Sequence, residues 1–208
     1  MSENNVCKIV YEGGQGEIVE KKSRFIATVK PVETEEEAVA FINEMKKKYW
    51  DARHNCSAFV IGSRQELTRC SDDGEPAGTA GRPMLDVLLR EEIHNTAVVV
   101  TRYFGGVLLG TGGLVRAYAK AAVGALEAAQ TTETAEFVEF TVTFPYSKTG
   151  SVTYAAEKHA IPILDRKFAD RVVFILRAEV PTAEQFRESF AEDISVSFAE
   201  LRREIAPR

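Results

Sequence analysis

The sequence predicts an α+β protein with two domains, and three observations predict it. The chain opens in strand-like segments and then carries one strongly amphipathic helix. A β-branched run over residues 97–104 leads through a glycine-rich loop into another helix. After residue 136 the pattern runs strand, helix, strand, strand, helix, strand. With 208 residues, of which 45% are hydrophobic and 27% charged, the chain can bury two compact cores.

The first elements are short strands followed by a helix. Val6–Glu20 has the pattern of a β-hairpin that turns at its glycines, and Ser23–Val29 that of a further strand. Thr34 is a favourable N-cap, with Glu37 three residues later, for a helix over Glu35–Tyr49. Apolar residues recur on one face of that helix, so we expect this face to be buried.

The middle of the chain alternates strands and helices around two turn-rich loops. The loops are an acidic one over Ser71–Gly81 and a glycine-rich one over Gly105–Gly113. The other expected elements are strand Cys56–Gly62, helix Pro83–Glu92, strand Ala97–Phe104 and helix Leu114–Ala129.

The last third of the chain has the element order of a ferredoxin-like split βαβ unit. The polar stretch Gln130–Glu136 indicates a domain boundary, which gives domains over residues 1–132 and 133–208. The expected elements are strand Phe137–Phe144, helix Ser147–His159, strand Ile163–Phe168, strand Arg171–Val180, helix Thr182–Ala191 and strand Ser195–Arg202.

Composition limits the location and the partners of the chain. The start has no apolar run behind a basic stretch, and no window approaches the roughly 18–20 uncharged apolar residues of a membrane helix. Three cysteines without a CxxC pair fit a reducing compartment, so we expect a cytoplasmic protein without a membrane partner. A net charge of −5 argues against a broadly basic nucleic-acid module, and we expect no sequence-specific DNA binding.

The segment Arg102-Tyr103-Phe104-Gly105-Gly106, with Leu109-Gly110 after it, resembles the signature of the Impact family and its bacterial YigZ-type members. The resemblance covers essentially the whole chain. It implies an N-terminal domain similar to the second domain of ribosomal protein S5, and a ferredoxin-like C-terminal domain similar to one in elongation factor G. Eukaryotic Impact proteins regulate translation and carry an additional N-terminal partner-binding domain, which we expect this chain to lack.

The glycine-rich loop is a candidate anion site. Gly110, Gly112 and Gly113 precede a helix, where unpaired backbone N–H groups and the helix dipole favour a negative charge. Arg102 on the preceding strand and Arg116 in the first helical turn are candidate partners of that anion. Alternatively, the glycines permit close packing or a positive φ. The candidate residues are Arg102, Gly105, Gly106, Gly110, Thr111, Gly112, Gly113 and Arg116.

Two familiar nucleotide motifs are absent from this sequence. There is no GxxxxGK[ST], and Val115 stands where the dinucleotide fingerprint needs Gly or Ala. We therefore expect no nucleotide cofactor.

A second set of residues suggests acid/base or divalent-cation chemistry. If the fold brings His54 beside Asp72, Asp73 and Glu75, with Arg53 nearby, these side chains form a candidate catalytic site. Alternatively, the three acids cap a turn or the next helix, and His54 is a hydrogen-bonded structural histidine.

The cysteines are weaker candidates for chemistry. A zinc site from His54, Cys56 and Cys70 matches no common ligand spacing, so we expect no metal. A nucleophilic cysteine would need a neighbouring base, and only His54 is close in sequence.

Lys21, Lys22 and Arg24, beside Phe25, form a candidate contact surface for RNA. A solvated strand edge protected by lysine is the equally simple interpretation.

Three functions remain in competition. The first is a translation-linked binding or regulatory protein that contacts RNA, the ribosome or a translation factor through the glycine-rich loop. The second is a hydrolase or phosphoryl-group enzyme that uses His54 and the acidic loop. The third is a scaffold that holds another protein through the second domain.

Overall fold

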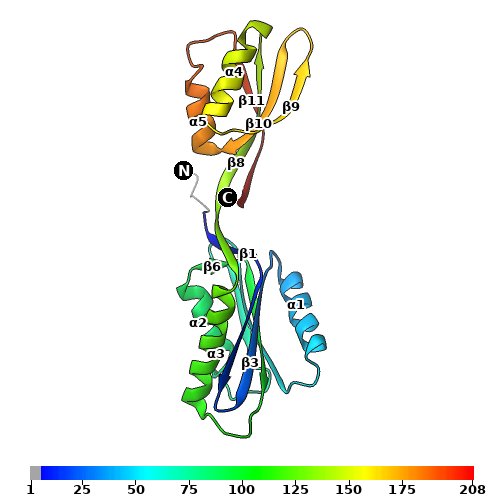
Figure 1. The fold of residues 1–208 in the computed structure, drawn as a ribbon, viewed down its shortest axis with the longest axis vertical. Helices are drawn as coiled ribbons and strands as arrows, with labels where there is room; N and C mark the ends of the chain where they lie inside the picture. The colour runs from blue at the N-terminus through cyan, green and yellow to red at the C-terminus, as the bar shows by residue number, and fades with distance from the viewer. Residues whose placement is uncertain (1–5) are drawn as a thin grey trace. The chain divides into compact units, whose positions relative to one another are not determined.

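The computed structural model describes residues 6–208, which form two compact units (Figure 1). One unit contains residues 6–134 together with 207–208, and the other contains residues 135–206. The first five residues of the predicted N-terminal domain lie outside the described part. The α+β class predicted from the sequence is confirmed, with sheets and helices in both units. Within the described residues, no helix is long and apolar enough to cross a membrane.

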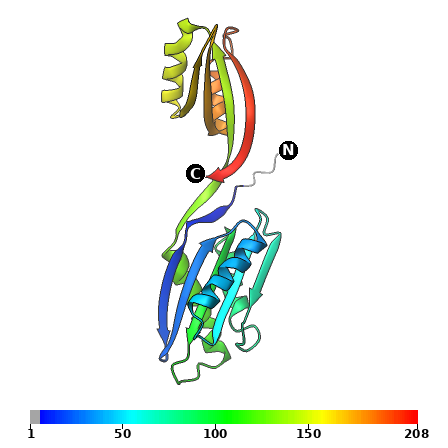
Figure 2. The ribbon, with the colours of Figure 1, turned by 90° about the vertical axis from the view of Figure 1, so that its right-hand side faces the viewer.

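The N-terminal unit is organised around a five-stranded antiparallel sheet with the order β2-β3-β7-β4-β5. Its strands are β2 Gly14–Glu20, β3 Ser23–Pro31, β4 His54–Ile61, β5 Leu67–Ser71 and β7 Thr96–Tyr103. Helix α1, Glu35–Lys48, lies across one face of this sheet, as Figure 2 shows. Helices α2, Gly81–Arg90, and α3, Thr111–Glu127, cover the opposite face.

Strand β7 is central in this sheet and buried on both faces. Val98 and Val100 pack into the core beneath α2 and α3. Ala97 and Val99 pack into the core beneath α1. Because neither face meets water, the strand is a continuous apolar run instead of an alternating one.

The predicted hairpin over Val6–Glu20 is wrong. Strand β1, Lys8–Glu12, pairs in parallel with β6, Ile93–His94, and antiparallel with the start of β8, Gln130–Phe144. The hairpin is formed instead by β2 and β3, and its two-residue turn has φ values of 45° and 66° at Lys21 and Lys22. Such a turn normally contains Gly or Asn, so two lysines gave no recognisable turn signal.

Helix α1 follows the sequence prediction closely. The Thr34 hydroxyl accepts the backbone N–H of Glu37 at 3.2 Å, which caps the helix as expected. The Glu37 carboxylate accepts the N–H of Glu33 instead of that of Thr34, so the reciprocal half of a capping box is absent.

The C-terminal unit has the sheet order β9-β10-β8-β11, which is the arrangement of a ferredoxin-like split βαβ unit. Its helices pack on one face of the sheet, where the core lies. After β8 come a 3₁₀ turn at Tyr146–Lys148, α4 Thr149–Lys158, β9 Ile163–Phe168, β10 Val172–Glu179, α5 Val180–Glu188 and β11 Ser197–Pro207.

The stretch Gln130–Glu136, where the sequence predicts a domain boundary, is part of a continuous strand. It forms the first half of β8, whose residues 130–133 pair with β1 and whose residues 137–144 pair with β10. The three threonines of this stretch favour a strand, and its backbone pairs with β1.

Candidate functional site

The end of β7 carries an ion pair that is buried in the N-terminal unit. The Arg102 guanidinium Nη1 lies 2.6 Å from Glu75 Oε1, and these side chains are only 7% and 3% exposed. The guanidinium lies 5.5 Å from the ring centres of both Phe25 and Phe104, and Nη2 donates to Ser23 Oγ at 3.4 Å. Arg102 thus joins the acidic loop, strand β3 and Phe104, the residue before the glycine-rich loop.

A tyrosine and a thiol extend this buried network. Tyr118 on α3 donates its hydroxyl to Glu75 Oε1 at 2.8 Å. Cys56 on β4 donates to the carbonyl of Asp72 at 2.9 Å and to the Tyr118 oxygen at 3.4 Å. Burial raises the pKa of Cys56 to about 12 and also raises the pKa of Tyr118. Both groups are therefore protonated at neutral pH, and Cys56 is not a ready nucleophile.

Asp72 organises the start of α2. Its carboxylate accepts backbone N–H groups from Gly78, Ala80 and Gly81 at 2.8, 2.9 and 2.9 Å. Burial alone would raise the pKa of Asp72, but these three hydrogen bonds outweigh it and hold the pKa below its ordinary value. The aspartate therefore satisfies backbone donors that the helix itself cannot pair.

Asp73 fixes the same loop to its neighbours. Its carboxylate accepts Lys46 Nζ at 2.6 Å and the backbone N–H of Asn55 at 2.7 Å. The His54 Nδ1 atom lies 3.0 Å from the backbone carbonyl oxygen of Asp73. The fold thus brings the two predicted segments together, but His54 meets the loop through its backbone and not through a carboxylate.

The glycine-rich loop is shaped largely by backbone requirements. A Cβ on Gly105 would lie 2.0 Å from the backbone of Lys22, and the Gly105 N–H donates to Ser23 Oγ at 3.2 Å. Gly106 and Gly110 have φ values of 83° and 73°, which glycine adopts without strain. Close packing and positive φ therefore account for these three glycines, while Thr111 and Gly112 are exposed in the first turn of α3.

The placement of Arg102 differs from the sequence expectation. As a partner of an external anion it would have to face solvent, whereas its guanidinium is buried against Glu75. Arg116 does lie at the surface, with one guanidinium nitrogen 3.6 Å from a Cβ built on Gly112. The two arginines proposed for one anion site therefore stand in different environments.

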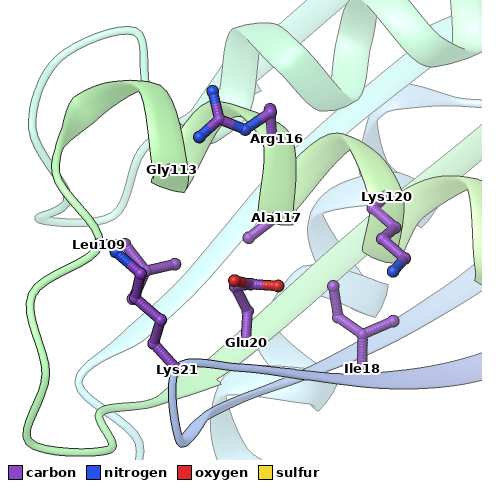
Figure 3. A pocket seen from close by; sticks show the side chains of 8 residues that line it. All are labelled: Ile18, Glu20, Lys21, Leu109, Gly113, Arg116, Ala117 and Lys120. Atoms are coloured by element: carbon purple, nitrogen blue, oxygen red, sulfur yellow. The ribbon is translucent and has the colours of Figure 1, made fainter.

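A cavity of about 220 Å³ opens between the end of β2 and the first turns of α3 (Figure 3). Lys21 and Arg116, both proposed from the sequence, line it, together with Gly113. Arg24 instead pairs with Glu17 at 2.6 Å on the exposed strand. The lining residues are Ile18, Glu20, Lys21, Leu109, Gly113, Arg116, Ala117 and Lys120.

The sequence interpretation missed Glu20 and Lys120 in the cavity, and Tyr118 in the buried network. Arg116 and Lys120 are four residues apart, so a helical projection places them on one face. That signal was available once the helix had been assigned. No sequence pattern links Tyr118 to Glu75, since 43 residues separate them.

Comparisons with known proteins cover both units. The family model of the Impact N-terminal domain matches residues 21–126. An Impact family member of Haemophilus influenzae is 39% identical over 84% of this chain and 86% of its own length. YvyE of Bacillus subtilis is 56% identical over 53% of this chain, but the match spans about half (51%) of that relative.

A solved crystal structure also matches most of the chain. It is described as a hypothetical protein and is 30% identical, with a TM-score of 0.62 over 95% of this chain and 98% of its own. A family model that matches about half of the chain and a relative that aligns with most of it agree on one assignment. This chain belongs to the Impact family.

Proposed function

We propose that this protein is a translation-linked binding or regulatory protein that contacts RNA, the ribosome or a translation factor. The contact surface is the end of the N-terminal unit where the Lys21–Lys22 turn and the glycine-rich loop meet. The observation that carries the proposal is the cluster of exposed cations there, which includes Arg116 and Lys120. Membership of a family whose eukaryotic members regulate translation supports the same assignment.

The local charge of this surface matters more than the net charge of the chain. Lys21, Lys22, Arg116 and Lys120 form no ion pair within residues 6–208, although the whole chain has a net charge of −5. A local basic patch attracts phosphate even on an acidic protein, because the field decays over about 8–10 Å at physiological salt. The patch therefore supports an RNA contact despite the acidic net charge.

The glycine-rich loop and the residue before it also present apolar side chains to solvent. Phe104, Val107 and Leu108 are 51%, 41% and 81% exposed. Adjacent exposed apolar side chains are typical of a surface that another macromolecule covers. This feature supports a macromolecular partner over a small substrate.

The enzyme alternative has less support. A general base must reach its proton within hydrogen-bond distance or through one water. Asp72 and Asp73 accept hydrogen bonds that hold their own loop, and Glu75 is paired with Arg102 in the core. His54 contacts a backbone carbonyl, so these four residues favour an architectural role.

Co-sedimentation with purified ribosomal particles across a salt series tests the proposal. We expect the wild-type chain to pellet with the particles at low salt and to be released as salt rises, since phosphate contacts displace counterions. The variant Lys21→Gln/Lys22→Gln should bind more weakly and with a shallower salt dependence.

The control is a variant with two charges removed elsewhere, Lys47→Gln/Arg90→Gln. Both residues are exposed on helices and form no ion pair in the described part of the chain. Wild-type protein that stays in the supernatant at low salt contradicts the proposal. Equal weakening by both variants would assign the effect to net charge.

A further inference from the structure

The cavity in Figure 3 is lined by the last residues of β2 and by α3, whereas the first residues of β2 contact α3 closely. The alternating positions of β2 from Gly14 onward are Gly14, Gly16, Ile18 and Glu20. A Cβ on Gly14 would lie 2.5 Å from the Ala125 carbonyl oxygen, so the two backbones are in contact there. Ile18 and Glu20, the next positions in this alternation, carry side chains and line the 220 Å³ cavity. The cavity therefore lies beyond the last glycine of β2.

Three cations are among the residues that line this cavity. Lys21 comes from the turn after β2, while Arg116 and Lys120 are one helical turn apart on α3. None of the three forms an ion pair within the part of the chain that the structure describes. Other cations of the same unit do pair, namely Arg24 with Glu17, Lys46 with Asp73 and Arg82 with Asp86.

One carboxylate partly offsets this charge. Glu20 points from the strand into the cavity toward the helix in Figure 3. Three positive charges and one negative charge leave a net charge of +2 on the lining residues. Like charges around one cavity repel each other, and an anion bound between them relieves that repulsion.

The size and lining of the cavity indicate what kind of anion it suits. At roughly 30 Å³ per water molecule, 220 Å³ corresponds to about seven waters, which is more than a single small ion occupies. Ile18, Leu109 and Ala117 supply apolar wall beside the cations. A phosphate with its attached sugar matches this combination better than a free ion does.

We infer that this cavity binds backbone phosphates of an RNA strand, with Arg116, Lys120 and Lys21 as the ligands and Glu20 as an internal counter-charge. The inference rests on the proposed function and narrows it to one cavity and one ligand class. It excludes Arg102 from the ligands, since its guanidinium is paired in the core.

The test is binding of a fluorescent ten-nucleotide single-stranded RNA, measured by anisotropy across a salt series. In Arg116→Gln/Lys120→Gln, the slope of log K against log salt should fall by about 1.4, which corresponds to two phosphate contacts on a single strand. The matched variant Lys47→Gln/Arg90→Gln removes the same charges from other helices and should leave the slope unchanged. Thermal unfolding of each variant verifies that it is folded.

A third variant tests the counter-charge. Glu20→Gln removes the carboxylate from the cavity, so affinity for the same RNA should rise about threefold at low salt. If the affinity of Glu20→Gln for the RNA is unchanged or lower, the placement of the RNA strand in the cavity is wrong. Equal slopes for wild type and Arg116→Gln/Lys120→Gln would overturn the inference as a whole.

Inorganic phosphate distinguishes a strand from a free ion. If phosphate at millimolar concentration binds, as followed by backbone amide shifts of Gly113 and Arg116, while the RNA does not, the cavity holds a free ion and the strand proposal fails. A different result would show that the proposed link to translation fails while the cavity inference holds. In that case the RNA binds with the expected slopes, but the protein does not pellet with ribosomal particles.

Discussion

The central strands of the two units differ in how many of their faces are covered. Strand β7 is buried at seven consecutive positions, because α1 packs on one face of its sheet and α2 and α3 on the other. Strand β10 alternates between buried and half-buried positions, since α4 and α5 cover one face of its sheet only. The first unit is a three-layer structure, and the second is a two-layer structure with an open sheet.

The two units also differ in whether they contain a buried ion pair. The N-terminal unit encloses Arg102 and Glu75 at 7% and 3% exposure. The C-terminal unit places its pairs at the surface, with Arg177 and Glu204 3.0 Å apart at 32% and 37% exposure. Water screens the Arg177–Glu204 pair but not the Arg102–Glu75 pair. Breaking the buried pair therefore costs more stability than breaking the exposed one.

The largest expected effect comes from breaking the two pairs one at a time. Arg102→Met leaves the Glu75 carboxylate buried without its cation and should destabilise the N-terminal unit by about 3–5 kcal/mol. Arg177→Met should cost about 0–1 kcal/mol in the C-terminal unit. Urea unfolding, monitored by hydrogen exchange in each unit, measures both losses of stability.

The double variant Arg102→Met/Glu75→Gln sharpens this comparison. It removes both charges, so it should be clearly less destabilising than the sum of the two single variants. A loss below about 1 kcal/mol in Arg102→Met alone would contradict the isolation of this pair from water.

The second prediction concerns glycines in the two units. A Cβ on Gly16 would lie 2.8 Å from the Gly124 carbonyl carbon on α3, so Gly16→Ala must separate strand and helix at a cost of about 1–3 kcal/mol. Gly150 in α4 has open space around it, and Gly150→Ala should stabilise the C-terminal unit by roughly 0.5–1 kcal/mol. Thermal unfolding that shows the same sign for both would refute this account of their packing.

The third and smallest effect tests the covered and open faces directly. Val99→Thr places a hydroxyl in the core beneath α1 and should cost about 1 kcal/mol or somewhat more. Val173→Thr places the same group on the half-exposed face of β10 and should cost less than about 0.5 kcal/mol. Chemical unfolding of the two variants compares the faces, and equal losses would mean that the face of β10 is not open.

The α+β class and the helix over residues 35–48 were predictable because local patterns specify them. Thr34 caps α1 through a hydrogen bond to a residue three positions away, and the buried face of α1 repeats at helical spacing. The pairing of β1 was not predictable, because its partners lie at Ile93 and Glu133. Strand pairing over such separations depends on the whole fold and not on the strand sequence.

The candidate site also has one part that local sequence patterns indicate and one part that they do not. The glycines before the helix are a local pattern, and the φ of 73° at Gly110 agrees with the alternative interpretation that they permit a positive φ. The burial of Arg102 is not local, because it depends on Glu75 and Phe25, which come from two other segments of the chain. The sequence alone predicted that Arg102 binds an anion at the surface.

By itself the sequence determined the element types, the glycine-rich signature and the family resemblance, all of which depend on residues near one another along the chain. Only the tertiary structure decided which charges are paired and which remain unpaired. Arg102 and Arg116 are equivalent as residue types, yet one is enclosed with a carboxylate and the other is exposed and lines a cavity. The physical reason is that desolvation and pairing depend on the distance between segments in space.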